Sequence, residues 1–232
     1  MSKSDMLSYL LDNFGEPEQA TKVSDKEISE YVGKVPETIL TFWRDHGRGS
    51  YLNGFFWFCD PALLQPILRT LFEGDPEYNA EDMTTVGYSA FGSLEVWDKT
   101  KRIIGIDFLT STIYSPPDEY YFDLSTGRRL NDNILVQTPM TSFINSDRGD
   151  FDEALATLGK LEPGEIYGYA PVLQLGGSQD VEHLHRIKIV EHLAMICELS
   201  RFNLTRLTPP DPPAFPFGRL EVIRPVGPLT RQ

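Results

Sequence analysis

The strongest constraint on the fold of this chain is a change of hydrophobic period between Met83 and Phe122. Apolar side chains alternate there with polar or small ones at residues 94–97 and 104–108, and residues 98–101 form a turn between the two runs. Alternation with a period of two indicates strands that bury one face, and short turns join such strands in antiparallel order. The sequence therefore predicts an antiparallel meander in the middle of the chain.

Helical spacing of apolar residues is found on both sides of this meander. Asp60 and Pro61 have the residue types of a helix cap and a first helical turn, whereas Pro66 should kink or split the helix that follows. The segments with helical spacing are 4–14, 25–32, 36–46, 61–72, 131–143, 150–161 and 180–199. We therefore assign the chain to the α+β class, with N-terminal helices packed on a curved antiparallel sheet, then a small helix/strand C-terminal domain, in one compact body.

Three regions are predicted along the chain. The polar segment 145–149 is the best interior linker, so a first domain is expected at 1–145 and a second at 146–204. A short strand at 166–169 is expected within the second domain. The remaining residues, 205–232, include seven prolines and are expected to form an extended, polyproline-like tail on the surface.

The net charge of the chain is −13, and it is distributed unevenly. Residues 1–170 contain 28 acidic and 14 basic residues, whereas residues 171–232 contain 6 and 7. Binding to nucleic acid or to an anionic membrane requires lysine and arginine against phosphate, so the composition argues against both as direct partners. It favours a partner that is itself basic.

Histidine and glycine patterns do not predict a catalytic centre. His185 and His192 are seven residues apart on the helix predicted for 180–199, whereas metalloprotease helices place two histidines four residues apart around a glutamate. Phosphate-binding glycine motifs are absent from the sequence. We therefore expect no catalytic residues, no metal and no cofactor. An enzyme that uses its carboxylates, or the face shared by His185 and His192, remains an open alternative.

Clusters of acidic residues in predicted loops are the candidate binding surface. Most charged runs are solvated faces, but loops also supply binding residues more often than other elements do. An aromatic residue beside such a cluster offers an anchor for a protein partner. The candidate partner-binding residues are Glu73, Asp75, Glu77, Tyr78, Glu81 and Asp82, followed by Asp118 and Glu119.

Targeting signals are not recognised in this sequence. The first residues lack the apolar stretch of a signal peptide, and no apolar run approaches the ~18 residues of a membrane span. Cys59 and Cys197 lie in apolar runs, as expected of buried free thiols. The expected location is the cytoplasm.

Two series of residues resemble known bacterial domains. The first series consists of Phe14-Gly15, Val35-Pro36, Phe42-Trp43-Arg44, Gly47-x-Gly49, Gly54-Phe55-Phe56-Trp57, Asp60-Pro61, Ala90-Phe91-Gly92 and Leu94-x-Val96-Trp97. The second consists of Gly164-Glu165-Ile166-Tyr167-Gly168-Tyr169-x-Pro171, Leu173-x-Leu175-Gly176-Gly177 and Val190-Glu191-His192-Leu193-Ala194. The first series resembles the GAD-like domain, and the second resembles the small C-terminal domain that accompanies it.

This pair of domains is similar to the immunity proteins of type VI secretion DNase toxins. The resemblance implies a non-enzymatic bacterial antitoxin that binds its cognate DNase toxin by protein–protein interaction. A DNase presents a basic surface to DNA, and an acidic inhibitor is suited to cover it. A secretion-system adaptor that binds through the proline-rich tail remains the other open alternative.

Overall fold

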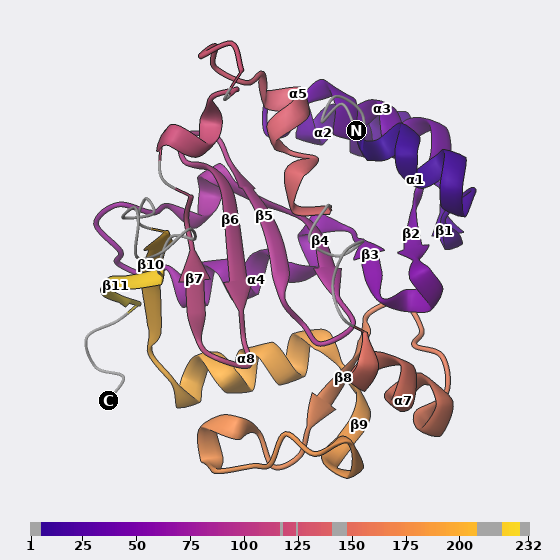
Figure 1. The fold of residues 1–232 in the computed structure, drawn as a ribbon, viewed down its shortest axis with the longest axis vertical. Coiled ribbons are helices and arrows are strands. Elements are labelled where there is room, and N and C mark those ends of the chain that lie inside the picture. The colour runs from indigo at the N-terminus through magenta and orange to yellow at the C-terminus, as the bar shows by residue number, and fades with distance from the viewer. Residues whose placement is uncertain (1–5, 117, 124, 141–147, 208–219, 228–232) are drawn as a thin grey trace.

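The sheet at the centre of the molecule is open and mostly antiparallel (Figure 1). The computed structural model describes residues 6–116, 118–123, 125–140, 148–207 and 220–227. Within these residues, nine strands form one sheet in the spatial order β1-β2-β3-β4-β5-β6-β7-β10-β11, in which only β7 and β10 run parallel. The strands are β1 (Glu18–Thr21), β2 (Arg48–Tyr51), β3 (Phe56–Phe58), β4 (Met83–Ser89), β5 (Leu94–Asp98), β6 (Arg102–Asp107), β7 (Thr112–Tyr114), β10 (Phe202–Leu207) and β11 (Leu220–Val226).

The predicted antiparallel meander is confirmed as β4 to β7. In its register Leu94 lies opposite Ile106 and Val96 opposite Ile104, so these four side chains occupy the same face. Leu94 and Ile104 are both 0% exposed. The period-two pattern therefore identified the face that carries Leu94 and Ile104. The expectation that only one face is buried is wrong, because every residue of β4 is buried and Trp97 and Ile103, on the opposite face, are 4% and 5% exposed.

Seven α-helices surround the sheet in the described part of the chain. Ser24 and Glu27 form a reciprocal capping box at the start of α2, and Asp60 accepts a hydrogen bond from the N–H of Ala62 at the start of α4. The helices are α1 (Met6–Phe14), α2 (Asp25–Tyr31), α3 (Glu37–His46), α4 (Pro61–Leu71), α5 (Asp132–Leu135), α7 (Gly149–Leu158) and α8 (Ile189–Leu199).

Pro66 does not split α4, which rules out one of the two outcomes expected from the sequence, a kink or a split. The helix continues from Pro61 to Leu71 with Pro66 inside it. A proline at this position removes the single hydrogen bond that its nitrogen would donate to the carbonyl of Ala62. Both Pro66 and Ala62 are exposed, so water can satisfy that carbonyl while Leu64 and Leu68 stay buried.

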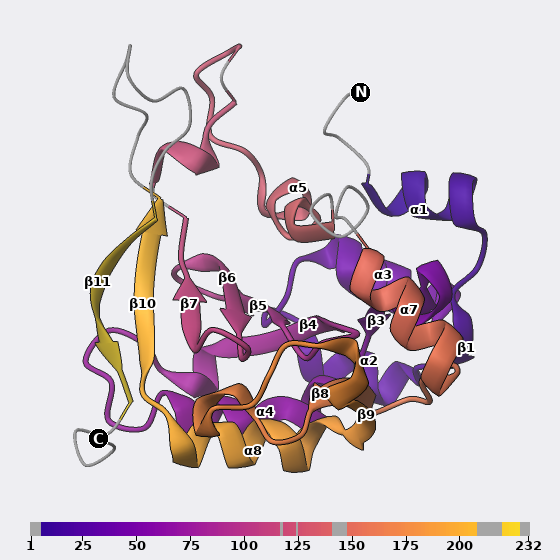
Figure 2. The same cartoon turned by 60° about the horizontal axis from the view of Figure 1, so that its bottom comes forward.

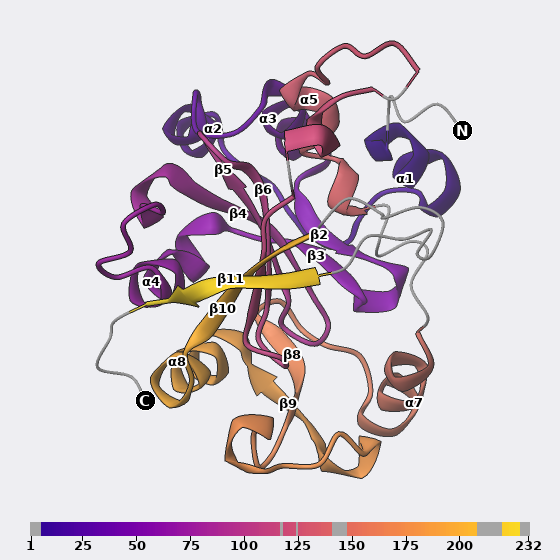
Figure 3. The same cartoon turned by 60° about the vertical axis from the view of Figure 1, so that its left-hand side comes forward.

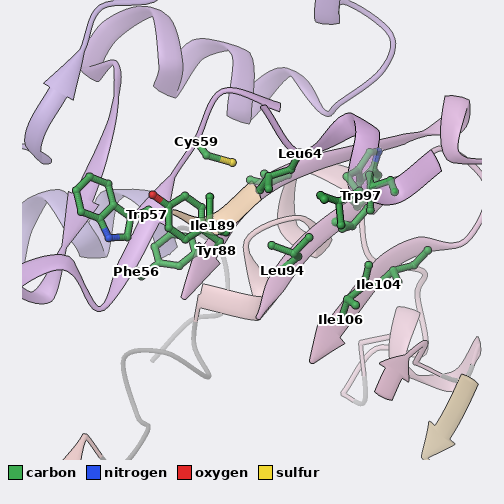
Figure 4. Close-up of a cluster of buried hydrophobic side chains, with 14 of the residues drawn as sticks. Phe56, Trp57, Cys59, Leu64, Tyr88, Leu94, Trp97, Ile104, Ile106 and Ile189 are labelled. Atoms are coloured by element: carbon green, nitrogen blue, oxygen red, sulfur yellow. The ribbon is translucent and has the colours of Figure 1, made fainter. Parts of the chain in front are cut away.

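A central part of the hydrophobic core lies between the sheet and the pair α4 and α8. Figure 2 shows these two helices beneath the central strands and α5 on the opposite side. Leu64 of α4 and Ile189 of α8 are 0% exposed and join the strand residues Leu94, Ile104 and Ile106 in one cluster (Figure 4). Cys59 and Cys197 are buried free thiols, as predicted.

The helix predicted for residues 180–199 is wrong in its first half. Residues 181–183 form a 3-10 turn, and Leu184–Lys188 form strand β9, which pairs antiparallel with β8 (Glu165–Tyr169). Glu165 on β8 binds both Arg186 and Lys188 of β9 through its carboxylate. Pairing with a neighbouring strand, which helical spacing does not report, therefore decides the conformation of this segment.

The two parts of the chain that precede and follow residue 145 are joined by hydrogen bonds and by close packing. The N–H of Tyr167 donates to the carbonyl of Ala90 (2.8 Å), and the N–H of Gly164 donates to the hydroxyl of Tyr88 (3.0 Å). Gly92 lies so close to Ile166 and Leu193 that a Cβ there would be 3.0 Å and 3.2 Å from their side chains. The α+β assignment and the single compact body are thus confirmed, while the exact boundaries at 145 and 204 stay predictions.

The described residues of the C-terminal segment form strands, not the polyproline-like tail predicted for 205–232. Residues 202–207 and 220–226 form the antiparallel pair β10–β11 (Figure 3), and β10 joins the main sheet beside β7 (Figure 2). Pro225 lies in β11, the edge strand, where a missing N–H is tolerated. The region 205–232 therefore contributes to the sheet as well as containing the remaining prolines.

Candidate functional site

The predicted acidic loop joins α4 to β4, and we refer to residues 73–82 by this name. The loop ends in a 3-10 turn, Ala80–Asp82. It brings together six of the candidate residues, but it does not expose all of them. The side chain of Asp75 is 1% exposed, and Tyr78 is 3% exposed. Glu73, Glu77 and Glu81 are exposed and Asp82 is partly buried, so these four carry the surface charge of the acidic loop.

Asp75 is held by an arginine from a distant part of the chain. Arg224 of β11 donates to both carboxylate oxygens, with Nη1 2.6 Å from Oδ2 and Nη2 2.9 Å from Oδ1. Oδ1 also accepts the backbone N–H groups of Glu77 and Tyr78, at 2.9 Å and 3.0 Å. Burial opposes ionisation of Asp75, but the hydrogen bonds from Arg224 and the backbone outweigh it and lower the pKa of the carboxyl group. Asp75 therefore fastens the acidic loop to β11.

Basic side chains accompany most of the exposed acids of the acidic loop. Arg224 also binds Glu77 (2.8 Å), and Lys101 lies 3.9 Å from the same carboxylate. In addition, Arg69 binds Glu81 at 2.6 Å, and Lys99 lies 3.5 Å from Asp82. Among the described residues, Glu73 has no ion pair of this kind. The free negative charge of the loop is therefore smaller than its sequence indicates.

For the second pair of candidate residues the structure describes the backbone alone. Asp118 and Glu119 begin a 3-10 turn, Asp118–Tyr121, that follows β7. Their side chains lie outside the part of the structure that is described. Whether they reach a partner remains a prediction.

The histidines do not share a face. His185 is exposed on β9, whereas His192 is 8% exposed on α8. Burial lowers the pKa of His192, which favours its neutral form. The face proposed for an enzyme from His185 and His192 is therefore wrong, because the two residues belong to different elements.

One small cluster of possible metal-ligating groups is present among the described residues. Ligand atoms of Asp180, Glu182 and His183 lie within 4.8 Å of one another, with both carboxylates exposed. Exposed acidic groups at such distances are common on protein surfaces, and a structural metal site would need a closed set of buried ligands. The cluster gives no reason to assign a metal centre.

Glu95 is a polar residue that the sequence pattern placed on the outer face of the meander. On β5 it lies opposite Gly87 of β4 and Gly105 of β6, so no side chain flanks it on either neighbouring strand. No described residue forms a hydrogen bond or ion pair with its carboxyl group. Burial raises the pKa of Glu95 to about 8, so the group is mostly protonated at neutral pH. The only indication in the sequence is glycine: the residues opposite Glu95 on both neighbouring strands, Gly87 and Gly105, are glycines.

No helix among the described residues combines the length and the apolar character needed to cross a bilayer. This finding concerns only the helices of the described ranges.

Comparisons with known proteins divide the chain into two matched regions. Residues 5–110 match the GAD-like domain, and residues 142–200 match the domain described as type VI secretion immunity protein Tdi1, C-terminal. No curated protein sequence matches the chain. Among solved structures, the crystal structure of Atu4351 from Agrobacterium tumefaciens is similar, with a TM-score of 0.78 and 26% identity. The similarity covers 94% of this chain and 97% of that one.

Proposed function

We propose that this chain, which carries a GAD-like domain followed by a Tdi1-type C-terminal immunity domain, binds a secreted bacterial DNase toxin and neutralises it. The observation that carries the proposal is the match of residues 142–200 to the C-terminal domain of a type VI secretion immunity protein. Immunity proteins protect the producing cell by binding, and this family therefore suggests a non-enzymatic role. The cytoplasm of the producing cell is the location in which such protection is needed.

Charge complementarity supports a nuclease as the partner. A DNase needs a basic surface to bind phosphates, and this chain carries a net charge of −13. Complementary charge accelerates encounter more than it strengthens the final complex. Tight binding then requires buried anchors at the centre of the interface. Tyr78 is already buried within the chain and does not supply such an anchor, so other side chains must do so.

The acidic loop is retained as part of the proposed binding surface, through its exposed carboxylates. We expect the double variant Glu73→Lys/Glu81→Lys to bind the toxin about tenfold more slowly at low salt and with a weaker salt dependence. The toxin for this test has first to be identified as a secreted nuclease encoded beside the gene of this chain, and we call it the neighbouring nuclease. Association rates at several salt concentrations, measured by surface plasmon resonance, provide the test.

The matched control is Glu30→Lys/Glu191→Lys, which makes the same change of charge on α2 and α8. Equal association rates for wild type and the acidic-loop variant would remove the acidic loop from the interface. If the wild-type chain forms no complex with the nuclease at all, the proposed function itself is wrong.

A further inference from the structure

A second acidic surface lies at the opposite edge of the sheet from the acidic loop. Between the end of α1, strand β1 and the 3-10 turn Leu52–Gly54 there is a cleft of about 300 Å³, which we call the β1 cleft. Glu16 and Glu18 line it, and their side chains are 70% and 45% exposed. Phe14, itself 41% exposed, also lines it. Arg148 lines the cleft as well, so the lining carries two negative charges and one positive charge.

The carboxylates of the β1 cleft are held only by weak surface pairs. His46 Nδ1 lies 2.8 Å from Glu16, and Lys160 Nζ lies 3.1 Å from Glu18. Exposed pairs of this kind contribute little to stability, because water and salt screen them. Both carboxylates are therefore available to a stronger partner.

An unsatisfied hydroxyl group provides independent evidence that the β1 cleft is a binding site. Tyr51 on β2 also lines the cleft and is 2% exposed, and its hydroxyl group has no hydrogen-bond partner among the described residues. Burial, followed by the nearby charge of Glu16, raises the pKa of this hydroxyl group. A buried hydroxyl without a partner is costly, and a ligand that supplies a hydrogen-bond donor would satisfy its oxygen as an acceptor and so reduce the cost.

The rim of the β1 cleft contains strained backbone. Leu52 and Asn53 follow Tyr51 directly and have φ values of +58° and +62°. Two consecutive left-handed residues without glycine are unfavourable, above all for a bulky leucine. Strain of this kind is often found where a structure fixes a binding surface, and here it accompanies the unsatisfied hydroxyl group.

From these features we infer that the β1 cleft receives an arginine side chain of the toxin. This inference rests on the proposed function. A guanidinium group carries several N–H donors in one plane, which suits two separate carboxylates and the Tyr51 oxygen together. The exposed ring of Phe14 can pack against the plane of the same group. An arginine that would otherwise contact DNA phosphate is then occupied by the inhibitor.

Two variants test the inference against the same neighbouring nuclease. In Glu16→Gln/Glu18→Gln the carboxylates become neutral amides of the same size, and we expect affinity to fall about 30-fold. In Tyr51→Phe the hydroxyl group is removed, and we expect affinity to fall about fivefold. Because this hydroxyl group has no partner in the unbound chain, Tyr51→Phe should unfold at the same urea concentration as wild type, or at a higher one.

Isothermal titration calorimetry with variants of the 232-residue chain gives the affinities. The control for the loss of two negative charges is Glu30→Gln/Glu191→Gln. Loss of affinity in both cleft variants, with the control unchanged, supports the inference. Wild-type affinity in Glu16→Gln/Glu18→Gln overturns it and leaves the proposed function intact. A wild-type chain that does not bind the nuclease overturns both.

Discussion

Replacing Arg224 with alanine is expected to lower the free energy of unfolding by about 3 kcal/mol, because it leaves a buried carboxylate without its partner. The side chain of Asp75 is 1% exposed, and Arg224 binds both of its oxygens. The same arginine binds Glu77 and thereby fastens β11 to the acidic loop. Urea denaturation of the wild-type and Arg224→Ala chains at pH 7 measures the difference.

Arg69→Ala is the matched control for this prediction. Arg69 binds Glu81 in a similar forked geometry, but the two side chains are 58% and 61% exposed. An exposed pair contributes between 0 and about 1 kcal/mol, so the control should change stability far less. Equal effects of the two substitutions would show that the Asp75–Arg224 pair has no special role.

The pH dependence of the Arg224→Ala effect follows from the lowered pKa of Asp75. A carboxyl group with a lowered pKa in the folded state stabilises the fold above its unfolded pKa, and this contribution is lost as the pH falls through the folded value. The difference between wild type and Arg224→Ala should therefore shrink below about pH 4. A difference that stays constant down to pH 2 would contradict this explanation.

When Glu95 is replaced with glutamine, we expect the stability of the variant relative to wild type to increase as the pH rises from 5 to 8.5. The folded pKa of Glu95 is raised to about 8, above the unfolded value, so the wild-type chain loses stability as the pH rises between the two values. Each pKa unit corresponds to about 1.4 kcal/mol, and partial exposure reduces the total, so we expect a relative gain of about 3 kcal/mol. Stability measured in urea at several pH values gives this difference.

The informative quantity is the change with pH of the stability difference between Glu95→Gln and wild type. A buried amide has its own desolvation cost, which is the same at every pH and cancels in this comparison. Glu73→Gln, which makes the same substitution at an exposed position, is the matched control. A stability difference for Glu95→Gln that does not vary with pH would mean that the carboxyl group is hydrated in the folded chain.

Local patterns predicted the central part of this fold well, because they report burial directly. Alternation at Leu94, Val96, Ile104 and Ile106 identified the inner face of the meander. By contrast, β9 and β10–β11 depend on partners far away in the sequence. The helical spacing within residues 180–199 is compatible with either conformation, and only pairing with β8 selects the strand. A pattern within one segment does not report such pairing.

The candidate surface was predicted less well than the fold, for a similar reason. The sequence shows how many acidic residues the acidic loop contains, but it does not show which basic residues from other parts of the chain pair with them. Arg224 follows Asp75 by 149 positions, and nothing local indicates that the two meet. The β1 cleft was missed because its evidence, an unsatisfied hydroxyl group and a strained turn, exists only in three dimensions.

The structure also changes how the alternative role of the C-terminal segment can be tested. Deletion of residues 205–232 would remove half of β10, all of β11 and the partner of Asp75. Loss of protection in such a truncated chain would therefore report unfolding as readily as the loss of an adaptor function. Substitutions that leave β10, β11 and Arg224 in place are needed to separate the two.

The most direct test of the central claim is a titration of DNA cleavage. The neighbouring nuclease, at a fixed concentration well above the dissociation constant, is mixed with increasing amounts of the folded, full-length chain, and cleavage of plasmid DNA is measured. The proposed function predicts a linear fall in activity that reaches zero at a molar ratio of about one. Full nuclease activity in the presence of excess folded chain would contradict it.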